Sequence, residues 1–223
     1  MTERDGSAVV ILSGGLDSTV SLAMLCETHT VVRAITFDYG QRARLCEMKA
    51  AAAIAAHYNV PHQVITLDWL GDMLPEDLQG SRAVESLAHR DGLEMGRVWV
   101  PNRNGVFLNI AAAVAEAYGA GAIAFGANAD EGRDFPDNTP AYRDALNAAL
   151  QYSTRNGVRV VTPVGHLTKA AMVAEAVRLK APLESVWSCY GAGPRHCGEC
   201  PSCTLLQGAL KASAPEILAA VFH

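Results

Sequence analysis

Two absences in the sequence narrow the class of protein before any motif is considered. Aromatic residues make up only 6% of the 223 residues, and no run of about 18 apolar residues, the length that crosses a bilayer, occurs. Residues 1–15 lack a basic segment followed by an apolar core, so they do not predict a secretory signal. We therefore expect a cytoplasmic protein without a membrane segment.

An excess of positive charge is also missing. The formal net charge is −5 at pH 7, whereas a protein that binds nucleic acid without sequence specificity usually carries a basic surface. No nucleic-acid partner is expected on this ground. Half of the residues are hydrophobic, so a sizeable core can form, and the length of 223 residues fits one domain with small additions.

Cysteine is scarce outside one short segment. Two of the six cysteines, Cys26 and Cys46, are isolated in helical stretches, and the other four lie between residues 189 and 203. In a reducing compartment, four crowded thiols indicate a metal site rather than disulfides. Four thiolates suit a closed tetrahedral zinc site, although an iron–sulfur cluster also uses four cysteines. The predicted metal ligands are Cys189, Cys197, Cys200 and Cys203.

Strand-like and helix-like segments alternate along the chain. Short apolar runs predict strands at 8–12, 30–37, 62–68, 122–128 and 158–163. The intervening segments predict helices at 18–27, 44–59, 105–118, 140–153 and 168–180. This alternation predicts an α/β fold with a doubly wound five-stranded parallel sheet. Ligands of such sheets bind at the carboxyl ends of the strands, so we expect chemistry in the loops after strands one, two and four.

The domain organisation follows from the same pattern. We expect residues 1–185 to form the α/β domain, with a charged, glycine-containing insertion at 71–104 near the site. Residues 186–223 are expected to form a C-terminal zinc knuckle, a small segment that carries the four cysteines and a short helix.

The stretch SGGLDS follows the first predicted strand and opens the first predicted helix. Gly14 and Gly15 allow the backbone to approach a ligand closely, and amide groups at a helix start form an anion site. Asp17 would repel phosphates there unless a magnesium ion bridged them. The alternative is an ordinary turn in which Asp17 or Ser18 caps the helix. The loop lacks the lysine of a Walker A motif and the spacing of a dinucleotide fingerprint.

Five motifs occur in an order that matches one known family. They are SGGLDS at 13–18, FDYGQR at 37–42, VPNRN at 100–104, HLTKA at 166–170 and the terminal WSCY…HCGECPSC. Together they resemble the 7-cyano-7-deazaguanine synthase family of the PP-loop ATP pyrophosphatases, and the resemblance covers almost the whole chain. FDYGQR and the cysteine segment are the specific motifs, whereas SGGLDS alone would indicate only the superfamily.

The resemblance implies an ATP-dependent ligase that converts 7-carboxy-7-deazaguanine and ammonia into 7-cyano-7-deazaguanine. The carboxylate would be activated as an acyl adenylate, ammonia would give an amide, and a second activation would dehydrate the amide to the nitrile. Such an enzyme mainly positions its substrates and neutralises charge, so no acid–base pair is required in the sequence. The resemblance also implies ATP, Mg²⁺ and Zn²⁺ as cofactors, and a homodimer.

The resemblance further implies roles for individual residues. Those implied to hold the ATP phosphates are Leu12, Ser13, Gly14, Gly15, Leu16, Asp17, Ser18 and Thr19. Asp17, Lys169 and Arg103 are implied to be catalytic, although Lys169 would equally fit a surface lysine. Those implied to contact nucleotide or substrate are Tyr39, Gln41, Arg42 and Asn104, and the alternative for Asn104 is a helix N-cap.

The predicted substrate loop at 126–142 departs from the family pattern. Glu131 replaces an aspartate, residues 133–135 replace Ser-Gly-Tyr, and residues 138–139 replace Cys-Arg, whereas Pro136 and Asp137 match. We expect Glu131, Arg133 and Asp137 to contact the substrate. The departures indicate either drift in a surface loop or a changed specificity.

Two alternative functions remain open. The first is a paralogue that activates the same carboxylate but passes it to another amine, such as a protein N-terminus. Such a paralogue would resemble relatives of the family that occur in anti-phage operons. The second is a non-catalytic zinc-knuckle module that contacts RNA. The intact SGGLDS loop and the negative net charge argue against this second alternative.

Overall fold

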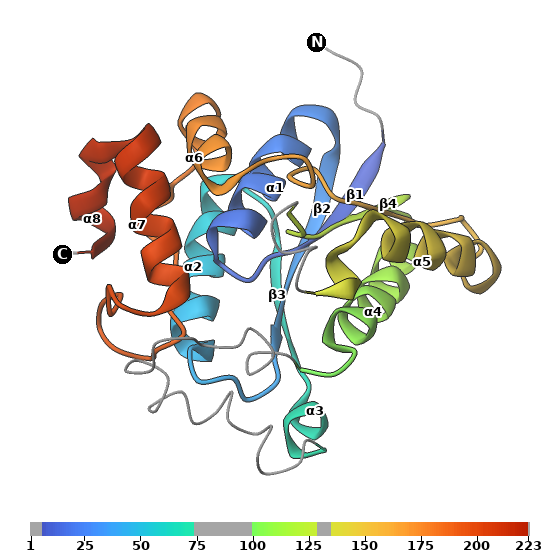
Figure 1. Ribbon diagram of the computed structural model, residues 1–223. Coiled ribbons are helices and arrows are strands. Elements are labelled where there is room, and N and C mark those ends of the chain that lie inside the picture. Colours follow the sequence, from blue (N-terminus) through green and yellow to red (C-terminus); the bar gives the residue numbers. More distant parts are fainter. Residues whose placement is uncertain (1–5, 74–99, 129–134, 223) are drawn as a thin grey trace.

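The computed structural model describes residues 6–73, 100–128 and 135–222, which form an α/β fold around one parallel sheet (Figure 1). The strands are β1 (Ser7–Ile11), β2 (Thr30–Asp38), β3 (His62–Thr66), β4 (Ala122–Ala124) and β5 (Arg159–Val161). Their order across the sheet is β3-β2-β1-β4-β5, and every neighbouring pair is parallel. The predicted five-stranded parallel sheet is therefore confirmed, although β4 and β5 are only three residues long.

Helices cover both faces of this sheet (Figure 1). On one face, α1 (Leu16–Thr28) and α2 (Arg44–His57) pack against the sheet, while α6 (Lys169–Arg178) packs against α1 and α7 (Pro201–Ser213) packs against α6. The other packs against α4 (Arg103–Ala117) and α5 (Pro140–Ser153). Two short helices, α3 (Asp68–Asp72) and α8 (Leu218–Phe222), and 3-10 turns at 136–138, 183–185 and 215–217 complete the described elements. Within the described ranges, no helix has the length and apolar character needed to span a membrane.

The central strand β1 is buried on both faces because helices lie on each side of it. Ala8 and Val10 belong to the core shared with α1 and α6, whereas Val9 belongs to the core shared with α4. All three side chains are fully buried. This two-sided burial explains why the strand is a continuous apolar run rather than an alternation of apolar and polar residues.

The strand order reverses at β1, and this reversal positions the site. Val10 lies opposite Ala34 of β2 on one side and opposite Ala124 of β4 on the other. The chain leaving β4 packs onto the start of α1, because a Cβ on Gly126 would lie 2.9 Å from the Ser18 amide nitrogen. Loops that diverge at such a switch point leave a crevice at the carboxyl ends of the strands.

Several helix boundaries differ from the sequence prediction. Helix α1 begins at Leu16 with Gly15 as its N-cap residue, so the alternative in which Asp17 or Ser18 caps the helix is wrong. Gly15 has the extended backbone that an N-cap requires, and glycine is among the residues favoured there. Helix α4 begins at Arg103 after Asn102, so Asn104 is not its N-cap. The C-terminal segment contains the 13-residue α7 and also α8, rather than one short helix.

The C-terminal segment packs directly against the loop at residues 13–18, which we call the glycine loop. The Trp187 amide donates to the Gly14 carbonyl at 2.8 Å. The His196 ring lies between those of Trp187 and Phe222, tilted to both, with centroids 4.6 and 5.0 Å away. Its Nε2 accepts from the Ser188 amide at 3.0 Å, so its Nδ1 carries the proton donated to the Val221 carbonyl at 3.1 Å. Both ring nitrogens are engaged within the protein, which leaves neither for a metal.

Gly14 is constrained by its backbone conformation and by its packing. Its φ is +82°, and a Cβ there would lie 2.8 Å from both the Ala50 Cβ and the Glu47 carbonyl oxygen of α2. Gly119 has a similar φ of +67°, but a Cβ there would meet nothing within 4 Å. We expect Gly14→Ala to lower the free energy of unfolding by about 2–4 kcal/mol, against about 1 kcal/mol for Gly119→Ala, in denaturant titrations. Equal losses of unfolding free energy in the two variants would show that the contact of the new Cβ with α2 adds no cost to that of the backbone conformation.

Candidate functional site

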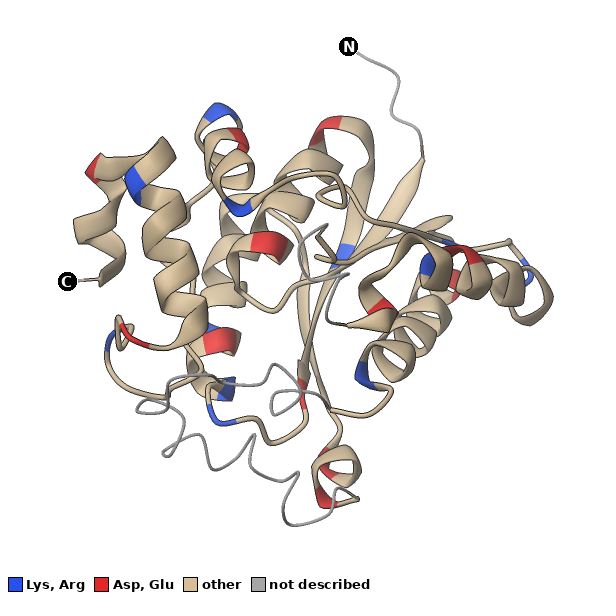
Figure 2. Ribbon diagram, in the orientation of Figure 1, with Lys and Arg blue, Asp and Glu red and all other residues tan. Residues whose placement is uncertain are grey.

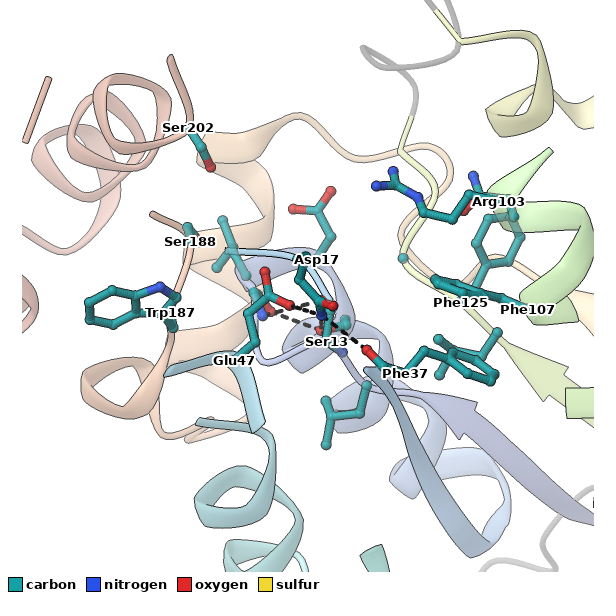
Figure 3. Close-up of a pocket in the computed structure, with 18 of the residues that line it drawn as sticks. Ser13, Asp17, Phe37, Glu47, Arg103, Phe107, Phe125, Trp187, Ser188 and Ser202 are labelled. Atoms are coloured by element: carbon teal, nitrogen blue, oxygen red, sulfur yellow. Dashed lines mark hydrogen bonds between the residues drawn. The ribbon is translucent and has the colours of Figure 1, made fainter. Parts of the chain in front are cut away.

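A cleft of about 320 Å³ opens at the carboxyl ends of the strands around the glycine loop (Figure 3). Its walls come from the ends of β1, β2 and β4, from α2 and α4, and from the C-terminal segment. The lining residues that the sequence predicted for the site are Leu12, Ser13, Gly15, Leu16, Asp17, Ser18, Tyr39, Gln41, Arg103, Asn104 and Lys169. The structure therefore gathers residues from four separate motifs into one space.

Hydrogen bonds within the glycine loop hold it beneath the first turn of α1. The Ser13 amide donates to Ser18 Oγ at 3.2 Å, and the two serine hydroxyls lie 3.1 Å apart. The Ser18 hydroxyl donates to the Gly15 carbonyl at 3.1 Å. Amide groups in the first turn of a helix have no carbonyl partner within the helix, and they carry its positive end. This part of the cleft can therefore bind an anion such as a phosphate.

Asp17 forms an ion pair with Lys169 in the cleft. Lys169 Nζ donates to the two carboxylate oxygens at 2.6 and 2.8 Å, and Asn128 Nδ2 donates to one of them. The side chain of Lys169 is 21% exposed and that of Asp17 is 14% exposed, so the surface-lysine alternative is wrong. Lys169 and Asn128 therefore balance the charge of the Asp17 carboxylate in this structure.

Arg103 lies at the start of α4 beside the ring of Tyr39. Its Nη1 donates to the Tyr39 hydroxyl at 3.0 Å. The pKa of the guanidinium is raised, and Tyr39 is the largest cause. The carboxyls of Asp137 and Glu47 also raise this pKa, whereas burial lowers it. Burial in turn raises the pKa of Asp137, which Arg103 partly offsets. The cleft thus holds a permanently charged guanidinium, a group suited to binding a carboxylate or phosphate oxygen.

Aromatic rings line the part of the cleft between β2 and α4 (Figure 3). Phe37 and Phe107 stack with ring centroids 4.2 Å apart and an interplanar angle of 13°. Tyr39 contacts Phe107 at 5.6 Å, and Phe125 also faces the cleft. Flat apolar surfaces next to a few polar groups are typical of sites that hold a planar heterocycle.

Gln41 and Glu47 form a second polar cluster in the cleft. The buried Gln41 amide donates from Nε2 to the Phe37 carbonyl at 3.0 Å and to Glu47 Oε2 at 2.8 Å, and its Oε1 accepts from the Tyr39 amide at 3.0 Å. Burial raises the pKa of Glu47, while the Gln41 bond and Arg103 oppose the increase and Asp38 adds to it. Gln41 lines the cleft and orients Glu47, and its predicted contact with substrate stays a prediction.

Some predicted residues lie outside the cleft lining or outside the described residues. Among the described ones, those that do not line the cleft are Gly14, Thr19, Arg42 and Asp137. Thr19 is fully buried and its hydroxyl donates to the Gly15 carbonyl at 2.8 Å, so it serves the loop rather than the cleft. Asp137 is buried, and its Oδ1 has no hydrogen-bond partner. Glu131 and Arg133 fall outside the described residues, so their substrate contacts stay predictions.

The four predicted cysteine ligands come together beside the cleft. Their sulfur atoms all lie within 4.8 Å of one another, and those of Cys197 and Cys203 are 3.9 Å apart. A tetrahedral zinc ion with Zn–S bonds of about 2.3 Å places its sulfurs about 3.8 Å from each other, so this donor set fits a single ion. Backbone amides, including that of Gly191 at 3.3 Å, donate to these sulfurs, which favours the thiolate form. Four cysteines bound to separate irons of a cluster would be more widely spread.

The metal-binding residues alternate with residues that line the cleft. Ser188 and Tyr190 flank Cys189, and Ser202 lies between Cys200 and Cys203 at the start of α7. Figure 3 shows Ser188 and Ser202 on the same side of the cleft as Trp187. A metal ion bound by the cysteines would therefore fix one wall of the cleft.

Sequence reasoning missed three groups of residues at this site. In the sequence, Glu47 looks like any acidic residue in the first turn of a helix, and Asn128 looks like any polar residue in the loop after β4. The aromatic residues Phe37, Phe107 and Phe125 resemble core residues. Phe37 opens the motif FDYGQR, Asn128 lies in the predicted substrate loop, and Phe125 precedes Gly126 at the end of a predicted strand, so these three had a signal in the sequence. Glu47 and Phe107 had none.

Comparisons with known proteins agree with this geometry. A family model described as queuosine biosynthesis protein QueC matches residues 7–214. The 7-cyano-7-deazaguanine synthase of Pelotomaculum thermopropionicum is 44% identical over 204 residues, which are 88% of this chain and 92% of that protein. The enzyme of that name from Methanosarcina mazei is 41% identical over 215 residues, covering 92% and 93%.

Similarity to solved structures supports the fold at lower sequence identity. The U34-tRNA thiolase NcsA from Methanococcus maripaludis, solved with its [4Fe-4S] cluster, superposes with a TM-score of 0.55 at 16% identity. The match covers 98% of this chain and 70% of the thiolase. At this identity the likeness shows a shared fold and nothing about the reaction.

Proposed function

Because the chain belongs to the family of the queuosine biosynthesis protein QueC, we propose that it uses ATP to convert 7-carboxy-7-deazaguanine and ammonia into 7-cyano-7-deazaguanine. It is an enzyme of the carbon–nitrogen ligase class, as its curated relatives are. The observation that carries the finer proposal is one cleft that combines an anion site, a charged guanidinium and a wall of aromatic rings.

The glycine loop is proposed to hold the phosphates of ATP. The amide groups at the start of α1 provide donors, and Lys169 provides a positive charge beside them because it contacts Asp17 in the first turn of that helix. When ATP arrives, Lys169 is proposed to turn from Asp17 to a phosphate oxygen. A carboxylate oxygen is a preferred ligand of magnesium, so Asp17 would then hold the magnesium ion that accompanies ATP and offset negative charge there.

The carboxyl-bearing heterocycle is proposed to lie between Arg103 and the aromatic rings. The Arg103 guanidinium would bind the carboxylate and orient one of its oxygens towards the α-phosphate of ATP. Phe37 and Phe107 provide a flat surface against which a planar ring can stack. Attack of a carboxylate oxygen on the α-phosphorus of ATP would form the acyl adenylate and release pyrophosphate. Ammonia would then displace AMP from the acyl carbon to give an amide. A second activation of the amide oxygen would allow loss of that oxygen and formation of the nitrile.

The four cysteines are proposed to hold one zinc ion with no open position. Zinc in a closed tetrahedral site contributes folding energy rather than chemistry. Here the zinc ion would hold residues 186–222 in place as a wall of the cleft. We therefore propose that residues 1–185 form the α/β domain and that the zinc-binding segment begins at residue 186. No step of the reaction requires the ion.

The test of this function is a product assay with the purified protein, ATP, magnesium, 7-carboxy-7-deazaguanine and ammonium. We expect mass spectrometry to show the nitrile, with AMP formed only when the carboxylate is present. Omission of the carboxylate is the control, because it removes the group that is adenylated. ATP use that stops at the adenylate or amide would favour the paralogue that serves another amine, and no consumption of the carboxylate would refute the proposal.

The altered loop makes the paralogue the second candidate, whereas the RNA-contacting module has little support. Asn138 at the end of this loop accepts from Asn104 Nδ2 at 3.0 Å, so the substituted segment reaches the cleft. Figure 2 shows acidic and basic residues interspersed over the described elements, which does not favour a nucleic-acid surface.

A further inference from the structure

Glu47 is a carboxyl-bearing cleft residue to which the proposed steps give no role. It lies on the first turn of α2 and lines the cleft together with the glycine loop and Arg103. Amide groups, a lysine and an arginine suit phosphates and carboxylates, whereas a glutamate repels both. A carboxyl at this position is therefore suited to a cationic or proton-donating partner, and ammonium is the one proposed substrate of that kind.

The geometry fixes one oxygen of Glu47 and leaves the other towards the cleft. Gln41 Nε2 donates to Glu47 Oε2 at 2.8 Å, and the other contacts of Gln41, to Phe37 and Tyr39, hold its amide in a single orientation. The neighbouring backbone is equally constrained, because the Glu47 carbonyl lies against Gly14. Figure 3 shows the Glu47 side chain turned towards Ser13 and Asp17. Oε1 is therefore presented to the cleft beside the glycine loop.

The surroundings of Glu47 are suited to proton transfer. The charged or titratable groups that face it are Arg103 from α4 and Asp38 from β2, and Gln41 donates to it from the turn before α2. Burial is the largest influence and raises the pKa of the carboxyl, which brings it nearer to neutral pH. A base is most effective when its pKa lies close to the working pH.

We propose that Glu47 is the catalytic base that accepts protons from the amine nucleophile. This inference rests on the proposed function. Glu47 Oε1 binds ammonium and takes one of its protons, which frees the nitrogen lone pair. The C–N bond then forms at the acyl carbon, the bond from that carbon to the AMP oxygen breaks, and AMP leaves with the electron pair. The nitrogen loses a second proton, so acyl adenylate and ammonium yield amide, AMP and two protons that pass through Glu47 to water.

A Glu47→Gln variant separates this role from a role in binding ATP or the carboxylate. Glutamine keeps the size of the side chain and an oxygen for Gln41, but it accepts no proton. We expect carboxylate-dependent exchange of pyrophosphate into ATP to stay within about threefold of wild type. Amide formation from ammonium should fall by about 10²- to 10⁴-fold, the usual contribution of general base catalysis. Glu184→Gln, at an exposed position in the 183–185 turn, is the matched control and should change neither rate.

Hydroxylamine gives the variant a nucleophile that is largely unprotonated at pH 7. We expect Glu47→Gln to form the hydroxamate within about tenfold of the wild-type rate, because the attacking nitrogen already has a free lone pair and the one proton released after attack can pass directly to water. Loss of pyrophosphate exchange in Glu47→Gln would overturn the proposal in favour of a magnesium or substrate contact, and unchanged amide formation would overturn it outright. Absence of exchange in the wild-type enzyme would instead refute the proposed function.

The wild-type pH profile tests the same role without any substitution. At fixed total ammonium, the fraction of free ammonia rises about tenfold for each pH unit below the pKa of ammonium. An enzyme whose own base deprotonates bound ammonium should show an almost level amidation rate from about pH 7 to 8 and lose it on the acid side as Glu47 becomes protonated. A tenfold rise per pH unit in the wild type would overturn the proposal, and this holds even if Glu47→Gln fails to fold.

Discussion

A Cys203→Ser variant is expected to lose its zinc and to unfold at a temperature about 10 °C below that of the wild-type protein. Cys203 is fully buried, and its sulfur lies 3.9 Å from that of Cys197. A serine hydroxyl is a poor zinc ligand, so the three remaining sulfurs would stay close together without the ion that offsets their charge. The wall formed by Ser188, Tyr190 and Ser202 should loosen at the same time and reduce turnover by at least about tenfold.

Metal content by mass spectrometry and the melting temperature by calorimetry measure these two effects independently. The matched control is Cys46→Ser, because Cys46 lies on α2 outside the cysteine cluster. It should retain one zinc ion per chain and melt within about 2 °C of wild type. One zinc ion retained by Cys203→Ser would contradict the four-sulfur site, and iron with sulfide in the wild-type protein would restore the iron–sulfur alternative.

A Lys169→Met variant is expected to lose about 10³-fold in the rate of carboxylate-dependent AMP formation. The lysine supplies positive charge where negative charge must be held during adenylyl transfer, and one such interaction commonly contributes about 10²- to 10³-fold. The same change leaves the Asp17 carboxylate with Asn128 but without its cation, and both charged side chains are mostly buried. We therefore also expect a loss of about 2–4 kcal/mol in the free energy of unfolding.

Stability and activity should separate in the double variant Asp17→Asn/Lys169→Met. Removal of both charges leaves no unpaired carboxylate, so the free energy of unfolding should recover by more than half relative to Lys169→Met. Activity should not recover, because both proposed phosphate-site groups are then missing. Recovery of activity together with stability would show that the ion pair only supports the fold, and a fully active Lys169→Met would refute the role of Lys169.

The features that the sequence predicts well are those encoded by neighbouring residues. The apolar run of β1 predicts burial on both faces, and the spacing of Cys197, Cys200 and Cys203 predicts a shared site that the structure then forms. The motif SGGLDS predicts a loop between a strand and a helix, since glycines and a helix start depend on local backbone preferences. Such patterns require no knowledge of which distant segments meet.

The features that could not be predicted depend on contacts between distant residues. Lys169 contacts Asp17 across 152 positions and Asn128 contacts it across 111, so no local pattern links these side chains. Glu47 lies in a helix without any motif of its own, and only the packing of α2 and α4 around the cleft brings it to the same space as Arg103. Strand β4 ends at Ala124 rather than at residue 128, because its pairing with β5 spans only three residues.

The hydrogen bond between the Trp187 amide and the Gly14 carbonyl joins the cysteine segment to the loop proposed to hold phosphates. When one ligand changes the affinity of a protein for a second ligand, the second changes the affinity for the first by the same factor. A metal ion bound by the cysteines and a nucleotide bound by the glycine loop would therefore change each other's affinity equally. If zinc bound by the cysteines raises the affinity for ATP, loss of ATP lowers the affinity for zinc by the same factor.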